Sequence, residues 1–221
     1  MDVSALLELF PPDGPGPTGP SGAPDVVADL VDLLGGVSLA GGLYRVFTVD
    51  EVTVWTARAG EAFPRLTSSI TAFGADWLGR LFVVDTARRD VTGRPLVLLL
   101  DVGAGEVMEI PETLEGLHVS ELVKQHDAAL ASVFYGMWRD GSGDRAPLLR
   151  SECVGYEVPL FLGGADDVSN LARGDMDVYW SLTGQLVQQA VGLPVGTIVH
   201  QVAVEPAPDP PRPRRRLFGR R

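Results

Sequence analysis

Hydrophobic residues recur with a helical period in two segments near the start of this 221-residue chain. In residues 24–36, apolar positions fall three and four apart, and a double glycine ends the pattern, as expected of an amphipathic helix. A second helix is predicted in residues 48–64, where Thr48 and Glu51 have the spacing of a capping box. The residues expected on the buried face of this second helix are Val52, Trp55, Ala59 and Ala62.

Short apolar runs of strand length dominate the next part of the chain. The predicted strands are 41–47, 68–74, 80–85, 95–101 and 106–110. Because glycine-rich turns separate the later runs, antiparallel pairing is favoured. A helical segment with a break near 125–127 follows at 120–138, and residues 175–191 read as a strand that changes into a helix. This order predicts an α+β fold with a central, mostly antiparallel sheet packed by helices.

The two ends of the chain differ in composition from the part between them. Residues 11–24 hold six Pro and four Gly, which oppose regular structure, and we expect the short amphipathic turn at 4–10 to fray. Residues 205–221 are rich in Pro and Arg and are expected to be disordered. The predicted organisation is therefore a linker segment at 1–24, one folded domain at 25–204 and a tail at 205–221.

The net charge of −11 is spread unevenly. The last ten residues, "RPRRRLFGRR", hold six Arg and no acid, so 12 basic and 29 acidic residues remain in the rest, a charge of −17. An acidic body repels nucleic acid and attracts basic protein surfaces. We therefore expect a basic protein partner. The Arg-rich tail is the only part that suits nucleic acid, and a solvated tail that aids solubility, or a tail that folds back on the acidic body, explains it at least as well.

Hydropathy and cysteine content bear on the compartment. The mean hydropathy is +0.14, and the longest apolar run, "PLVLLL", is far shorter than the roughly 18 residues that a membrane span needs. The first residues carry two acids and no basic residue, unlike a signal peptide. Cys153 is the only cysteine, so no intrachain disulfide is possible. We expect a cytoplasmic protein that does not enter a membrane.

No catalytic, cofactor-binding or metal-binding residues are predicted. His118, His126 and His200 lie far apart in the sequence and form no metal motif. Cys153 lies beside Glu152, and nearby acids raise the pKa of a thiol, so a buried, inert cysteine is expected.

Two pairs of carboxylates remain as alternatives for chemistry. Asp166 and Asp167 follow a double glycine, and Asp175 and Asp177 follow shortly after. An enzyme would need one member of such a pair to differ in pKa from the other, and the sequence shows no difference in their surroundings. Asp in a turn after glycine more often binds its own backbone, and we expect that role here.

Four stretches together carry a family resemblance. They are "GGLYRVF" (41–47), "FGADWLGRLFVVD" (73–85), "CVGYEVPLFLGGADDVSNL" (153–171) and "DMDVYWSLTGQL" (175–186). In order and spacing they resemble the C-terminal domain family of type VI secretion immunity proteins, over about residues 26–190. That resemblance implies a protein that neutralises a toxic effector, a nuclease in the best-known pairs, by binding it. Some members have an additional N-terminal domain, where this chain has the Pro/Gly-rich linker.

The resemblance and the acidic turns together give a set of candidate partner-binding residues. They are Asp76, Trp77, Arg80, Asp166, Asp167, Asn170, Asp175 and Asp177. Within the set, Asp76 and Arg80 are expected to tie a turn between two strands, and the acidic loops would imitate a phosphate backbone. The alternative to an immunity protein is a non-catalytic scaffold protein that joins a bacterial assembly through its basic tail.

Overall fold

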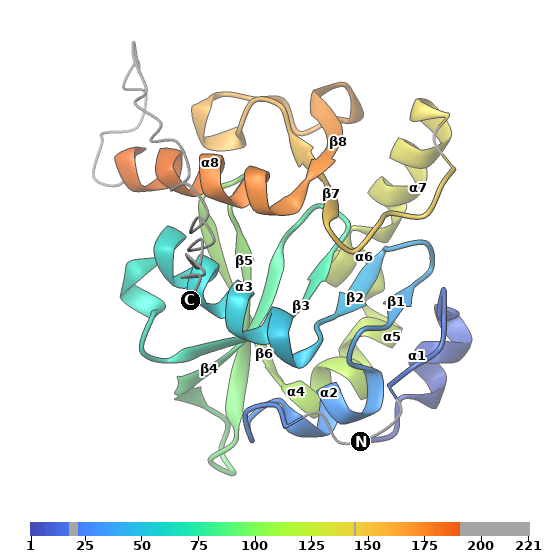
Figure 1. Cartoon of the computed structure of the whole chain (residues 1–221), viewed down its shortest axis with the longest axis vertical. Coiled ribbons are helices and arrows are strands. Elements are labelled where there is room, and N and C mark those ends of the chain that lie inside the picture. Colours follow the sequence, from blue (N-terminus) through green and yellow to red (C-terminus); the bar gives the residue numbers. More distant parts are fainter. Residues whose placement is uncertain (18–21, 144, 191–221) are drawn as a thin grey trace, which may run out of the picture.

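The computed structural model describes residues 1–17, 22–143 and 145–190. Its centre is a six-stranded antiparallel sheet in the order β1-β2-β3-β4-β5-β6, so each strand pairs with its neighbours in the sequence (Figure 1). The strands are β1 Ser38–Leu39, β2 Tyr44–Val46, β3 Ile70–Asp76, β4 Leu81–Arg89, β5 Pro95–Asp101 and β6 Glu106–Thr113. A second sheet pairs β7 Glu152–Tyr156 with β8 Leu171–Asp175. The predicted α+β fold with a mostly antiparallel sheet is confirmed.

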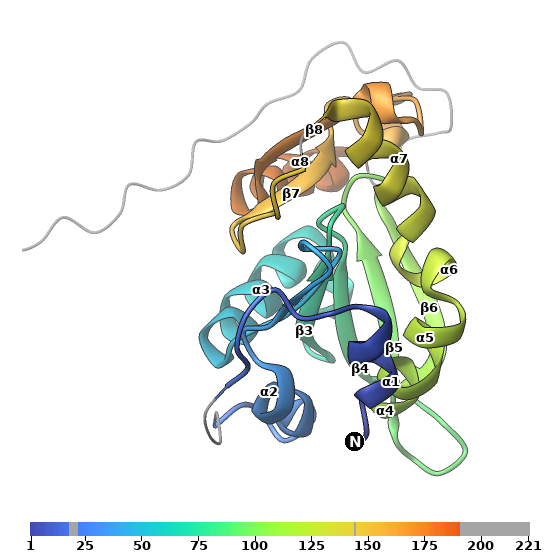
Figure 2. The ribbon, with the colours of Figure 1, turned by 90° about the vertical axis from the view of Figure 1, so that its right-hand side faces the viewer.

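Helices lie on both faces of the main sheet (Figure 2). They are α1 Ser4–Leu9, α2 Ala28–Leu34, α3 Val49–Ala62, α4 Leu114–Gly116, α5 Leu122–Lys124, α6 His126–Leu130, α7 Ser132–Ser142 and α8 Met176–Ala190. Short single-turn helices are η1 Pro64–Leu66, η3 Leu160–Leu162 and η4 Val168–Asn170, and η2 Leu117–Glu121 is a π-helix. Helix α3 covers one face of the sheet and α4 to α6 cover the other, while α8 and the β7–β8 sheet lie across one end.

The predicted start of α3 is confirmed. The Glu51 amide donates to the Thr48 hydroxyl at 3.3 Å, and the Thr48 amide donates to the Glu51 carboxylate at 2.7 Å. This reciprocal pair satisfies two of the amides that a helix start leaves without partners. The residues expected on the buried face of α3 are also buried: Val52, Trp55, Ala59 and Ala62.

The expected fraying of the N-terminal turn is wrong. Val3, Leu6 and Phe10 are all buried against the body, and Phe10 makes an edge contact with the His126 ring at 5.7 Å. Further along, the Asp13 carboxylate accepts hydrogen bonds from the backbone amides of the turn after β1, at 2.8 to 3.1 Å. Three apolar side chains spaced along one short helix are enough to dock it. The division of the chain at residue 25 stays a prediction, and the tail 205–221 lies outside the described residues.

The end layer formed by α8 and the β7–β8 sheet is fixed to the main sheet by buried side chains. Trp180 of α8 is fully buried, and its indole nitrogen donates to the Gly79 carbonyl at 2.7 Å. Tyr179 packs on the backbone of Gly155 and Gly103, where a larger residue would collide with its ring. The expectation that these two aromatic residues pack on the sheet is confirmed. Across the described part of the chain, no helix is long and apolar enough to cross a bilayer.

Candidate partner-binding surface

The turn that joins β7 to β8 is shaped by two glycines. Gly163 has φ of +90°, a backbone conformation that residues with a side chain rarely adopt. A Cβ added to Gly164 would lie 1.8 Å from the Val158 carbonyl oxygen, so no larger residue fits there without a shift of the backbone. The double glycine is therefore architectural, and it directs the next residues outward.

Asn170 closes this turn from inside. Its side-chain oxygen accepts from the Val158 amide at 3.0 Å, and its side-chain nitrogen donates to the carbonyls of Val158 and Ala165 at 2.8 and 2.9 Å. The residue is buried at 8% exposure, so a partner does not reach it. Asn170 positions the candidate surface from within. Its predicted role as a direct contact is not supported by this placement.

Asp166 and Asp167 lie exposed at the tip of the turn. The Tyr156 hydroxyl donates to the Asp166 carboxylate at 2.6 Å, and burial raises the pKa of Tyr156, so this hydroxyl stays protonated. Asp167 caps η4 by accepting from the Ser169 amide at 2.8 Å, and the hydrogen bonds from Ser169 lower the pKa of Asp167. Both carboxylates are held in place locally, as expected of turn residues, and both present negative charge to solvent.

Asp175 and Asp177 are also exposed, at the start of α8. Asp175 accepts from the Val178 amide at 2.9 Å, and this bond caps the start of α8. The negative charge of Asp175 also interacts favourably with the positive end of the helix dipole. Asp177 accepts two hydrogen bonds from Arg58 of α3, at 3.0 and 2.7 Å. One carboxylate thus serves the helix end and the other joins two helices, so these residues do not form a free acid and base pair.

Three of the predicted contact residues are in the interior. Asp76 and Trp77 are fully buried and Arg80 is 9% exposed. The Asp76 carboxylate accepts from the Arg80 side chain at 2.6 Å and from its amide at 3.0 Å, which confirms the predicted tie between two strands. The Trp77 indole donates to the Leu130 carbonyl at 2.9 Å. Because α6 and α7 cover the turn that carries them, these residues are not on the surface of the described structure.

Arg45 is a structural residue whose importance sequence reasoning missed. It is 1% exposed, and its guanidinium donates to the carbonyls of Leu149 at 2.8 Å, Asp76 at 3.1 Å and Glu152. These bonds fasten the segment before β7 to the main sheet. The available signal was an arginine in the middle of an apolar strand, since such a residue must find acceptors when the strand is buried.

The reactive side chains of the interior are held in unreactive forms. Burial is the largest cause that raises the pKa of the Cys153 thiol, to about 12, with smaller contributions from nearby acids. The expected burial of Cys153 is confirmed, although burial outweighs the neighbouring acids that were expected to raise its pKa; its inertness stays a prediction. Burial lowers the pKa of His118 to about 4, and its ring bonds to the Tyr44 hydroxyl and the Leu114 carbonyl, each at 2.8 Å.

The described residues also lack a cluster of side chains suited to a metal. In residues 1–17, 22–143 and 145–190, no group of three or more His, Cys, Asp or Glu is placed to hold an ion.

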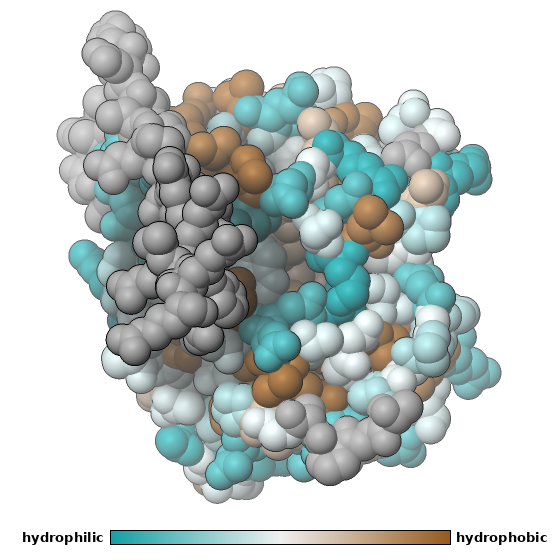
Figure 3. Space-filling model, in the orientation of Figure 1, coloured by the Kyte–Doolittle hydropathy of each residue, from teal (hydrophilic) through white to brown (hydrophobic). Residues whose placement is uncertain are grey.

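On the outside, apolar residues are exposed along α8 and over the turn next to it (Figure 3). They include Val158 at 48%, Val178 at 54% and Leu182 at 43%. The surface thus combines fixed carboxylates with exposed apolar side chains, a composition suited to protein contact.

A sequence model of the family described as "T6SS immunity protein Tdi1, C-terminal" matches residues 145–187. The match covers the segment held by Arg45, the β7–β8 sheet, the glycine turn and most of α8. The predicted resemblance to the C-terminal domain of type VI secretion immunity proteins is confirmed for this part of the chain.

A solved structure has a similar fold over most of the chain. The crystal structure of Atu4351 from Agrobacterium tumefaciens superposes with a TM-score of 0.54 and 12% sequence identity, over 83% of this chain and 89% of that chain. At this identity the likeness concerns the fold alone. No curated protein matches this chain.

Proposed function

We propose that this chain is an immunity-type protein that acts in the cytoplasm, where it binds a cognate secreted toxin and neutralises it by protein–protein contact. The observation that carries the proposal is the family match at residues 145–187, which includes the exposed acidic turn. The carboxylates of that turn are held by local hydrogen bonds, so a partner meets a preorganised surface and little side-chain freedom is lost on binding.

Charge supports a basic toxin. The chain carries a net charge of −11, which would steer it toward a positively charged protein and raise the association rate. Enzymes that cut nucleic acid bind a polyanion and have basic clefts, so a nuclease is the toxin class that this charge fits best. The proposed action requires no bond to be made or broken by this chain.

The direct test is co-expression with candidate toxin domains taken from the genes that flank this one. Wild-type chain should restore growth of a bacterial host that produces the toxin domain, and the purified proteins should form a complex in calorimetry. The association rate should fall steeply as salt rises from 50 to 500 mM, because screening weakens steering between exposed charges.

A charge-matched pair of variants tests whether the turn takes part. Asp166→Ala/Asp167→Ala removes two charges from the turn, and Glu8→Ala/Glu106→Ala removes two exposed charges from α1 and β6. Only the first variant should weaken the complex by about tenfold or more. If both variants weaken the complex equally, the turn contributes only through net charge. If wild-type chain does not restore growth, the immunity function is refuted.

A further inference from the structure

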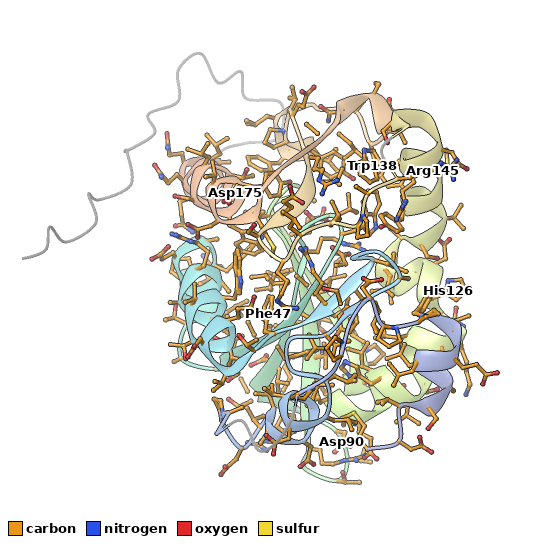
Figure 4. The ribbon with its side chains drawn as sticks, turned by 45° about the vertical axis from the view of Figure 1, so that its right-hand side comes forward. Phe47, Asp90, His126, Trp138, Arg145 and Asp175 are labelled. Carbon is orange, nitrogen blue, oxygen red and sulfur yellow. The ribbon has the colours of Figure 1, made fainter. Side chains whose placement is uncertain are left out.

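Helix α7 presents an apolar face to solvent. On its inner side, Tyr135 and Trp138 contact Trp77 with ring centroids 5.1 and 5.9 Å apart, and Trp138 points into the molecule (Figure 4). On its outer side, Val133 is 59% and Met137 57% exposed. Because these two residues are four positions apart, their side chains lie next to each other on the helix surface.

A glycine interrupts this outer face without a reason in the chain's own packing. A Cβ added to Gly136 would meet no atom within 4 Å. Packing explains two other helical glycines, since a Cβ on Gly60 of α3 would lie 3.0 Å from Thr67 and one on Gly184 of α8 would lie 3.1 Å from Ala62. Gly141 is also open, but it lies in the last turn of α7, beyond the apolar face. Since glycine weakens a helix interior relative to alanine, an open glycine beside two exposed apolar residues indicates close approach by another molecule.

Carboxylates lie at both ends of the apolar face. Asp127 accepts from the Val133 amide at 2.9 Å, and the side chain of Asp140, one turn after Met137, is 75% exposed. Arg139 turns away from the face, since its guanidinium lies over the Tyr135 ring at 5.4 Å and donates to that hydroxyl. The exposed pair between Asp140 and Arg145, at 3.1 Å, is screened by water.

Helix α7 lies next to the candidate partner-binding surface. Helix α7 packs beside η4, the single-turn helix that Asp167 caps, and the two elements lie at the same end of the molecule in Figure 2. The turn that carries the exposed Asp166 and Asp167 therefore lies close to α7.

We propose that the outer face of α7, formed by Val133, Gly136 and Met137, is the apolar centre of the toxin interface. The inference rests on the proposed function. Its occupant is a basic toxin surface with a protruding apolar side chain that sits over Gly136 and has Lys or Arg around it. The aspartates at the rim complement those basic residues, and the glycine admits the apolar side chain close to the helix backbone.

The test measures the dissociation constant of the full chain for the toxin domain that wild-type chain neutralises in the co-expression test. Met137→Arg should raise that constant at least about tenfold. In the proposed complex, it replaces an apolar contact with a positive charge that faces the basic residues of the toxin. Val54→Arg is the matched control, since Val54 is 55% exposed on α3 and gains the same charge. Gly136→Leu should also weaken binding at least about tenfold, while Gly136→Ala should raise the melting temperature of the free chain by about 2–4 °C.

Each other outcome refutes the inference in a distinct way. If wild-type chain binds the toxin domain and Met137→Arg binds as well as Val54→Arg, the immunity function stands and the α7 interface is wrong. A wild-type dimer in light scattering that Met137→Arg dissolves would make a second copy the occupant. A melting temperature for Met137→Arg several degrees below that of Val54→Arg would show that the chain itself covers this face. Failure of wild-type chain to bind overturns both proposals.

Discussion

Replacement of Trp180 by alanine tests how the end layer is attached to the main sheet. Trp180 is the largest side chain of α8 that is fully buried, and it contacts the rings of Trp55 and Phe63 at centroid distances of 6.5 and 6.3 Å. Its indole nitrogen also donates to the Gly79 carbonyl at 2.7 Å. The substitution therefore removes packing between α8 and α3 together with a hydrogen bond to the sheet.

The expected cost follows from these contacts. Truncation of a buried Trp to Ala costs about 3–5 kcal/mol, which includes the cavity that is left. Loss of the donor leaves the Gly79 carbonyl without its partner, at a cost of about 1 kcal/mol. We expect the free energy of unfolding to fall by about 4–6 kcal/mol and the melting temperature to fall by roughly 8–24 °C. Trp180→Phe keeps most of the ring and should cost only about 1–2 kcal/mol.

Urea unfolding followed by circular dichroism at 222 nm measures these values. If the sheet and the end layer unfold together, the urea concentration at the unfolding midpoint should fall. The slope of the unfolding free energy against urea concentration should stay constant. Val178→Ala is the control, because Val178 lies on the same helix with 54% of its surface exposed and should change stability by less than about 0.5 kcal/mol. A loss below about 1 kcal/mol for Trp180→Ala would refute the buried packing, and a second unfolding transition would show that the end layer unfolds separately.

Three further predictions concern buried groups. An unfolded histidine takes up a proton below about pH 6.5, whereas His118 in the folded chain does so only near pH 4. The free energy of unfolding should therefore fall by about 3 kcal/mol as the pH drops across that window, and His118→Asn should lack this part of the fall in urea titrations. Cys153 should not react with a thiol reagent at pH 8 until urea unfolds the chain, since its pKa is about 12; rapid native labelling would contradict its burial. Gly164→Ala should cost about 1–3 kcal/mol in urea unfolding because of its clash with the Val158 carbonyl, and Gly174→Ala is the control, since a Cβ there meets no atom and the backbone has no positive φ.

Local features of the fold could be predicted from the sequence. The capping box of Thr48 and Glu51 depends on residues three positions apart, and the strands of the meander depend on short apolar runs between glycine turns. The same holds for the end of α5 at Gln125, where a break was predicted. In each of these cases the determining contacts lie within a few residues of one another. The strand expected within 175–191 instead ends at Asp175, and α8 begins at Met176.

Burial of the candidate site could not be read from local pattern. Asp76, Trp77 and Arg80 have the polarity and aromatic character of interface residues, yet helices that follow some 50 residues later cover them. The docking of α1 was missed for a related reason, because six residues are too few for a helix to be stable alone and its partners come from α5 and η2. The outer face of α7 was also missed, since Val133 and Met137 resemble core residues until the inner side of the helix is known.

The long-range hydrogen bonds of Arg45 can form only late during synthesis of the chain. Its acceptors at Leu149 and Glu152 follow it by 104 and 107 residues, whereas the strands of the meander pair with near neighbours. At about 5–20 residues per second, roughly 5–20 s pass between the emergence of Arg45 and that of the segment it anchors. A nascent chain can therefore form most of the main sheet before the β7–β8 turn and α8 have been synthesised. Under the proposed function, it would bind a toxin only after α8 has left the ribosome.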